Sequence, residues 1–172
     1  MIDHQKMMDA YERDGFYALQ LEVGDRCEQG CIYCYMNGIP GGHNTLSDSQ
    51  IREILTQASE TGIAAVEWLG GEPLLRETVF EHMGLAAGLG LRNNVWTGGL
   101  PLKHPRVAAR CAEYARVGLI SVHVPTVDPE LYPRLHPDRP RTDLQDILSG
   151  VRTLLDLGYP PEQMLNSMTL TG

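Results

Sequence analysis

Several features are missing from this sequence of 172 residues. It has no run of about eighteen apolar residues, the length at which a membrane-spanning helix becomes a candidate. It also has no N-terminal apolar signal segment and no internal repeat. We therefore expect a cytoplasmic protein that has no membrane partner and no repeat architecture.

Positive charge is scarce. The chain has 14 Lys and Arg residues against 22 Asp and Glu residues, and its net charge is -8. Neutralising a phosphate backbone needs clustered cations, and the sequence has no stripe of Lys and Arg. The composition therefore counts against nucleic acid as the substrate. With 42% hydrophobic residues, the chain is long enough for one domain with a core of its own.

The chain has only four cysteines, and three of them lie close together. Cys27, Cys31 and Cys34 form one C-x3-C-x2-C run directly after a predicted strand, with no adjacent fourth cysteine. This clustering fits metal binding in a reducing compartment better than a disulfide framework. Iron-sulfur clusters normally take four cysteine ligands. Three cysteines on one loop therefore predict a cluster with one iron left for an exchangeable ligand.

Two other interpretations of the cysteines are open. The three thiolates and His43 could hold a structural zinc ion, although small zinc modules usually bring their ligands in two pairs. Cys111 could complete a closed four-cysteine cluster for electron transfer. However, Val107, Cys111, Tyr114 and Ala115 fall on one helical face, so we expect Cys111 to pack as a small buried hydrophobe. We expect His43 to be exposed in a loop.

A second motif, Gly70-Gly71-Glu72-Pro73, follows the apolar run 64–69 at the expected carboxyl end of a strand. Paired glycines let the backbone turn sharply and approach a ligand without an intervening Cβ atom. Glu72 supplies a carboxylate, and Pro73 stiffens the exit from the turn. Taken alone, such a turn is also a common connection between a strand and a helix.

Together the two motifs resemble those of a known enzyme family. The segment from Asp25 to Tyr35, with the aromatic Tyr33 directly before Cys34, resembles the cluster loop of the radical S-adenosylmethionine (SAM) enzymes. The segment 70–73 matches the "GGEP" segment of that family. The resemblance implies a [4Fe-4S] cluster and SAM as cofactors. The residues to which it assigns a role are Cys27, Cys31 and Cys34 as cluster ligands, Gly70, Gly71, Glu72 and Pro73 at the SAM amino group, and Tyr33 beside the adenine.

The hydrophobic pattern alternates between strands and helices. We predict strands at 16–23, 64–69, 91–96, 119–124 and 165–170. We predict helices at 3–12, 106–116 and 144–155, one that opens at a capping box of Ser47 and Gln50 and ends near Gly62, and one that starts at Val79 and stops at Gly88 or Gly90. Single helices between strands imply right-handed βαβ crossovers and an α/β fold with a parallel sheet. The resemblance implies an open six-stranded TIM-like barrel with its helices outside. We therefore expect residues 1–172 to form one radical SAM core domain, the N-terminal part of the barrel, which is either truncated after about strand five or minimal.

In parallel α/β folds, ligands bind at the carboxyl ends of the strands. Thr97 follows the third predicted strand, and His123 lies at the end of the fourth. Related enzymes commonly carry a Thr-Asn-Gly turn and a Ser-Leu-Asp-Gly turn at these places, and both turns contact SAM. This sequence lacks the asparagine and has His123 in place of the serine. Thr97 and His123 are thus candidate SAM contacts, and the alternative for His123 is a core histidine.

The segment after the fourth strand is rich in proline and basic residues. An arginine there could pair with the carboxylate of SAM. We expect most of these side chains to be solvated surface charges, namely Arg134, His136, Arg139 and Arg141.

The resemblance also implies an activity. One electron from a reduced flavodoxin or ferredoxin would cleave SAM to methionine and a 5′-deoxyadenosyl radical, which abstracts hydrogen from a small-molecule or peptide or protein substrate. The Cys-x-Tyr-Cys-Tyr ending of the loop and the segment 127–132 resemble the peptide- and protein-modifying maturases, such as the anaerobic sulfatase-maturing enzymes. A glycyl-radical-enzyme activase is one alternative. A zinc- or cluster-binding interaction or electron-transfer module is another.

Overall fold

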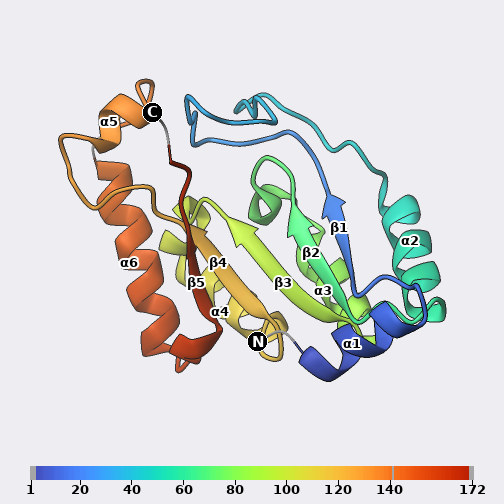
Figure 1. Cartoon of the computed structure of the whole chain (residues 1–172). Helices are drawn as coiled ribbons and strands as arrows, with labels where there is room; N and C mark the ends of the chain where they lie inside the picture. Colours follow the sequence, from blue (N-terminus) through green and yellow to red (C-terminus); the bar gives the residue numbers. More distant parts are fainter. Residues whose placement is uncertain (1–2, 141, 171–172) are drawn as a thin grey trace.

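A single parallel sheet organises the computed structural model, which describes residues 3–140 and 142–170 (Figure 1). Each strand pairs with the one before it along the chain, so the order is β1-β2-β3-β4-β5. All four pairings are parallel, as the alternation of strands and helices predicts. The strands are β1 (Ala18–Glu22), β2 (Ala65–Leu69), β3 (Arg92–Thr97), β4 (Leu119–His123) and β5 (Met164–Ser167).

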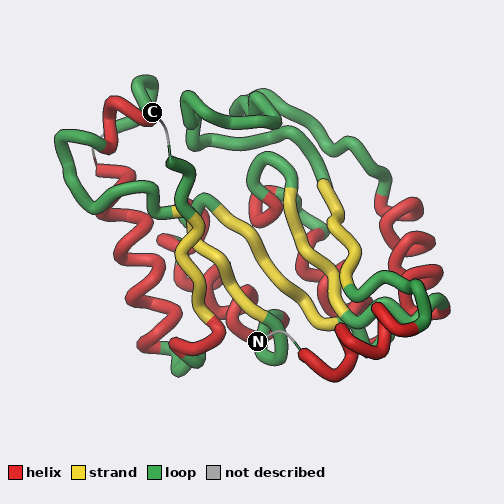
Figure 2. Tube along the Cα trace, viewed as in Figure 1, coloured by secondary structure: helices red, strands yellow, loops and turns green. Residues whose placement is uncertain are grey.

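The connecting helices pack side by side along one face of the sheet (Figures 1 and 2). Contacts run from α2 to α3, from α3 to α4 and from α4 to α6. These are α2 (Asp48–Glu60), α3 (Val79–Gly88), α4 (Pro105–Tyr114) and α6 (Thr142–Asp156), and α1 (His4–Glu12) precedes the sheet. Within the described ranges, no helix has the length and apolarity that a bilayer crossing requires.

The core lies between the sheet and these helices because alternate strand residues point to the same face. Leu21 is opposite Trp68, Trp68 is opposite Val95, and Val95 is opposite Ile120 in the strand register. All four side chains are buried in the hydrophobic core. Cys111 of α4 is also fully buried there, as its helical spacing predicts.

The intervening strand residues carry polar groups on the other face of the sheet. Asn94 Nδ2 donates a hydrogen bond to Glu67 Oε1 at 2.6 Å, and Trp96 Nε1 donates to Glu67 Oε2 at 2.5 Å. In a barrel built from such strands, this face lines the interior, which is where inward-pointing residues of parallel barrels lie.

The structure differs from the sequence predictions near its C-terminal end. Strand β5 ends at Ser167 rather than 170, because its ladder with β4 stops where His123 pairs with Ser167. The proline-rich segment 125–140 contains a short helix, α5 (Tyr132–Leu135). His136 was expected at the surface but is fully buried, since it stacks on Tyr132 with ring centroids 4.2 Å apart. Arg141 lies outside the described residues.

Candidate active site

The three cysteines lie on a long loop, residues 24–46, that runs from β1 to α2 past the carboxyl ends of the strands (Figures 1 and 2). Backbone hydrogen bonds shape it: Cys27 N donates to Ile39 O at 3.0 Å, and Ile39 N donates to Asp25 O at 3.2 Å. Gly38 leaves room for the first cysteine, because a Cβ atom at Gly38 would lie 2.7 Å from Cys27 Cβ. We call residues 24–46 the cluster loop.

A cavity of about 200 Å³ opens beside the cluster loop. It brings together the carboxyl ends of β2, β3, β4 and β5 with the loop itself, which is where a parallel α/β fold binds its ligands. Of the residues predicted for the site, those that line this cavity are Cys27, Cys31, Cys34, Tyr33, Gly70, Gly71, Thr97 and His123. Glu72 and Pro73 do not line it.

The residues weighed as further metal ligands, His43 and Cys111, lie apart from the three-cysteine cavity. Among the described residues, no three His, Cys, Asp or Glu side chains converge as one metal ion would require. His43 is exposed, its ring Nδ1 lies 3.5 Å from Asp25 Oδ1, and it does not line the cysteine cavity. Cys111 is buried in α4 and does not line that cavity either.

Cys27 is buried, Cys31 and Cys34 are partly buried, and one backbone donor already faces a thiol. Burial raises the pKa of Cys27 to about 11 and that of Cys31 to about 12. Loading iron must therefore displace thiol protons, which makes metal binding depend on pH. Gln29 N donates a hydrogen bond to Cys27 Sγ at 3.4 Å. Such donors to sulfur are among the features that set the potential of a bound cluster.

Gly70 and Gly71 line the cavity on one side and contact the backbone of the cluster loop on the other. Gly71 N donates to Gly24 O, and Glu72 N donates to Arg26 O, both at 2.8 Å, so the turn after β2 pairs with the chain after β1. A Cβ atom on Gly70, whose φ is 129°, would lie 2.5 Å from Gly24 O, and a Cβ atom on Gly71 would lie 2.4 Å from Arg26 O. No side chain fits at either position unless the loop backbone moves.

Glu72 turns away from the cavity and is buried. Its carboxylate accepts hydrogen bonds from Leu74 N at 3.1 Å, from Gly98 N at 2.8 Å, and from Thr97 Oγ1 at 2.9 and 2.8 Å to its two oxygens. Burial raises the pKa of Glu72 to about 7, against the opposing effect of these donors. The carboxylate thereby joins the glycine turn to the end of β3. Pro73 is buried at the start of a short 3-10 helix, η1 (Pro73–Leu75).

Tyr33 and His123 meet across the cavity wall. The Tyr33 hydroxyl oxygen lies 2.8 Å from His123 Nε2, and the two rings meet edge to face with centroids 5.6 Å apart. Burial lowers the pKa of His123, which favours the neutral imidazole. His123 is therefore a wall residue of the cavity rather than a core histidine.

The sequence did not predict that two polar side chains near the cluster loop are buried. Tyr132 and His136 are both fully buried, and Ile32 N of the loop donates to Leu135 O of α5 at 3.1 Å. Within the described ranges, neither the Tyr132 hydroxyl nor His136 Nε2 makes a well-formed hydrogen bond, although the Gln29 side chain is a weak neighbour of that hydroxyl. Unpaired buried polar atoms beside the loop are consistent with a site that is completed by a bound group.

The comparison with family models agrees with this geometry. The model described as the Radical SAM superfamily matches residues 21–172, and the chain belongs to this family. Its members use a [4Fe-4S] cluster and SAM. The chain is thus a radical SAM protein, and both cofactors expected from the sequence are confirmed at the level of the family.

Curated relatives have a more specific name. The chain is 30% identical over 157 residues to a probable GTP 3′,8-cyclase of Methanothermobacter thermautotrophicus, covering 90% of this chain and 49% of the relative. It is 31% identical over 157 residues to a probable GTP 3′,8-cyclase of Methanopyrus kandleri, covering 90% and 48%. The chain spans about half the length of these relatives. Their names refer to a nucleotide, whereas the loop sequence resembles peptide-modifying maturases.

Solved structures show the same fold. Streptococcus suis SuiB bound to S-adenosylmethionine superposes with a TM-score of 0.75 at 16% identity, covering 98% of this chain and 38% of that one. Methylornithine synthase superposes with a TM-score of 0.65 at 18% identity, covering 89% and 44%. These likenesses concern the fold alone. They confirm the expected parallel sheet of a partial, open TIM-like barrel.

Proposed function

We propose that residues 1–172 form the cluster- and SAM-binding domain of a radical SAM enzyme, with Cys27, Cys31 and Cys34 as the cluster ligands. The observation that carries this proposal is the cavity in which the three thiols meet the Gly70-Gly71 turn and the ends of four strands. Cys27, Cys31 and Cys34 would hold the cluster, which would supply the one-electron reduction of SAM that the family uses to start hydrogen abstraction from a substrate, with a flavodoxin or ferredoxin as the electron donor.

The protein residues supply position and polarity for this chemistry. The backbone of Gly70 and Gly71 lines the cavity, and we assign to it the hydrogen bond with the amino group of SAM. Tyr33 offers a ring to the adenine, and its position is fixed by His123. Glu72 and Thr97 act together, since their mutual hydrogen bonds hold the glycine turn against β3.

For the substrate, we propose a purine nucleoside triphosphate. The support is the identity of about three residues in ten to probable GTP 3′,8-cyclases over nine-tenths of this chain. Forming a bond to the 3′ carbon requires the loss of its hydrogen, which is the step that a 5′-deoxyadenosyl radical performs. A peptide substrate, as the cluster-loop sequence suggests, is the competing outcome of the experiment below.

The cluster assignment is tested with two matched cysteine variants of the protein, reconstituted without oxygen. Cys31→Ala should abolish the cluster, because it removes a ligand. Cys111→Ala should retain it, because that thiol is buried in α4. Iron and sulfide analysis with electron paramagnetic resonance gives the answer. Zinc in place of iron, or cluster loss in the Cys111 variant, would refute the three-cysteine site.

The substrate is tested with GTP deuterated at the 3′ carbon, in the full protein with SAM and dithionite. Deuterium should appear in the 5′-deoxyadenosine that is released. If SAM is cleaved but no deuterium is transferred, the nucleotide proposal fails while the cofactor assignment stands. Labelled peptides in parallel reactions then identify the competing class.

A further inference from the structure

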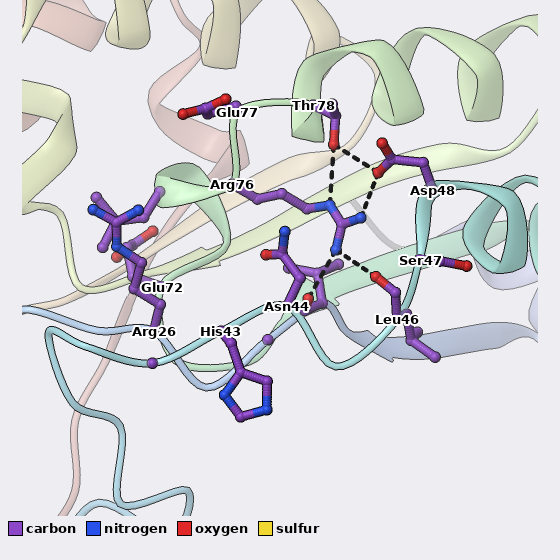
Figure 3. A pocket seen from close by; sticks show the side chains of 14 residues that line it. Arg26, His43, Asn44, Leu46, Ser47, Asp48, Glu72, Arg76, Glu77 and Thr78 are labelled. Atoms are coloured by element: carbon purple, nitrogen blue, oxygen red, sulfur yellow. Dashed lines mark hydrogen bonds and ion pairs between the residues drawn. The ribbon is translucent and has the colours of Figure 1, made fainter.

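A second pocket lies behind the cluster loop, between segments 42–48 and 72–78 (Figure 3). It measures about 690 Å³ and is lined mainly by polar side chains. Arg76, three residues after Pro73, lies along its wall with only 3% of its side chain exposed. Burying a guanidinium group costs free energy unless its donors are hydrogen-bonded. The groups that accept these hydrogen bonds therefore indicate why an arginine is buried at this position.

Each polar nitrogen of Arg76 has a partner, as Figure 3 shows. Nη1 donates to Val23 O at 3.0 Å and to Leu46 O at 2.9 Å. Nη2 donates to Asp48 Oδ1, and Nε donates to Thr78 Oγ1 at 3.1 Å. Only the planar, five-donor guanidinium can make these four bonds at once, because lysine has three donors on one nitrogen.

The two carbonyl groups that accept hydrogen bonds from Arg76 Nη1 lie at opposite ends of the cluster loop. Val23 directly precedes the cluster loop, and Leu46 is its last residue, so one nitrogen bridges the two ends of the loop. The end next to α2 is fixed further by Asp48, the first residue of that helix. Asp48 Oδ1 also accepts hydrogen bonds from Thr78 Oγ1 and from His82 Nε2, both at 2.8 Å.

We propose that Arg76 is a positioning residue that closes the cluster loop at its base and thereby keeps Cys27, Cys31 and Cys34 at cluster spacing against the glycine turn. This inference rests on the proposed cluster site. Arg76 belongs to the same short segment as Gly70 and Gly71, so the guanidinium ties the cysteine-bearing loop and the SAM-facing turn into one unit. The start of the loop already pairs with this segment through Gly71 N to Gly24 O and Glu72 N to Arg26 O, both at 2.8 Å. Arg76 adds the other end of the loop, because its Nη1 also donates to Leu46 O.

Three arginine variants of the reconstituted protein test this role. In Arg76→Ala, chelator should remove the cluster about tenfold to a hundredfold faster than in wild type, the factor expected for losing hydrogen bonds to a charged group. Amides of 24–46 should exchange faster, while those of the β-sheet should not change. Arg76→Lys should behave similarly, because one ammonium group cannot hold both carbonyls and Asp48. Arg92→Ala, which removes an ion pair to Asp3 at the other end of the sheet, is the control and should match wild type.

Chemical rescue separates positioning from a general loss of stability. The pocket gives small cations a route to the vacated site, so millimolar guanidinium should slow cluster loss in Arg76→Ala, whereas equal sodium chloride or urea should not. Loss of the cluster at the wild-type rate in Arg76→Ala, or in Arg76→Lys should the alanine variant not fold, would overturn the proposal. If wild type itself takes up no cluster, the proposed function fails, and amide exchange in 24–46 still decides the role of Arg76.

Discussion

At the scale of single residues, two buried tyrosines differ in one respect. Tyr132 and Tyr159 are almost completely inaccessible to solvent. The Tyr159 hydroxyl donates a hydrogen bond to Ala115 O at 3.0 Å, whereas the Tyr132 hydroxyl makes no well-formed hydrogen bond among the described residues and has the Gln29 side chain as a weak neighbour. A satisfied hydrogen bond contributes about 1 kcal/mol to stability, and a buried unsatisfied group costs about 1 to 3 kcal/mol.

This difference predicts opposite results for the same substitution. Tyr159→Phe should lower the free energy of unfolding of the metal-free protein by about 1 kcal/mol, because the Ala115 carbonyl loses its donor. Tyr132→Phe should leave it unchanged or raise it. Urea denaturation of the two variants measures both effects. A larger loss for Tyr132→Phe than for Tyr159→Phe would show that the Tyr132 hydroxyl has a partner, such as a buried water.

The sequence predicted the site residues that carry a local pattern. Cys27, Cys31 and Cys34 are close together in the chain, and Thr97 and His123 are found by following each strand to its end. Arg76 could not be found in this way, since its partner Val23 lies 53 positions away. The hydrogen bond between Glu72 and Thr97 could not be predicted either, because the two residues are 25 positions apart in the sequence.

At the scale of elements, two helical glycines make contrasting predictions. A Cβ atom at Gly88 of α3 would meet nothing within 4 Å, whereas one at Gly150 of α6 would lie 2.7 Å from Leu102 Cβ and 2.9 Å from Leu102 C. Gly88→Ala should stabilise the protein by about 0.5 to 1 kcal/mol through helix propensity. Gly150→Ala should destabilise it, because α6 must move away from Leu102. Thermal unfolding ranks the two variants, and equal gains would contradict the close approach of α6.

The contact between α2 and α3 should be sensitive to acid. Hydrogen bonds from Arg76, then His82 and Thr78, hold the pKa of Asp48 well below its ordinary value. The Asp48 carboxyl group therefore binds its proton more tightly in the unfolded chain than in the folded one. The stability that the ionised Asp48 contributes is lost as the pH falls below about 4. Other charged groups that line the pocket are Arg26, His43, Glu72 and Glu77.

Asp48→Asn tests this linkage. The variant should be less stable than wild type at pH 7, and the difference should shrink as the pH is lowered toward 3. Urea denaturation across this range measures both proteins under the same conditions. A constant difference at every pH would mean that Asp48 does not titrate with unfolding.

Hydrophobic spacing was sufficient to predict the five strands and the long helices, because each has a buried face with a regular period. The short helix α5 was missed, since four residues around Pro133 carry no period that distinguishes them from a loop. The predicted end of β5 lies too far along the chain, because a strand ends where its pairing with the neighbouring strand ends, here at the pair His123 and Ser167. Exposed apolar residues such as Leu170 continue the pattern after the ladder with β4 has ended.

At the scale of the whole molecule, β5 has a paired side and an open side. In the part of the chain that the structure describes, β5 pairs with β4 alone, and Leu165, Met168 and Leu170 are exposed on or just after it. An open strand edge with apolar side chains promotes pairing with another chain. We therefore expect the 172-residue chain, expressed alone, to self-associate.

Lysine on the strand should reduce this association, as charged residues do on natural edge strands. Leu165→Lys should shift the chain toward monomer in analytical ultracentrifugation. Val117→Lys, at an exposed apolar position outside the strands, is the matched control and should leave the distribution unchanged. A monodisperse wild-type monomer would contradict the expectation.

The sequential strand order also bears on how the protein is made. Each strand lies beside the one synthesised just before it, so a nascent chain can add one βα unit at a time as it leaves the ribosome. Val23, Leu46, Arg76 and Asp48 all belong to the first two of these units. The base of the cysteine loop can therefore close while β4 and β5 are still untranslated. Assembly of the metal site can begin on an incomplete polypeptide.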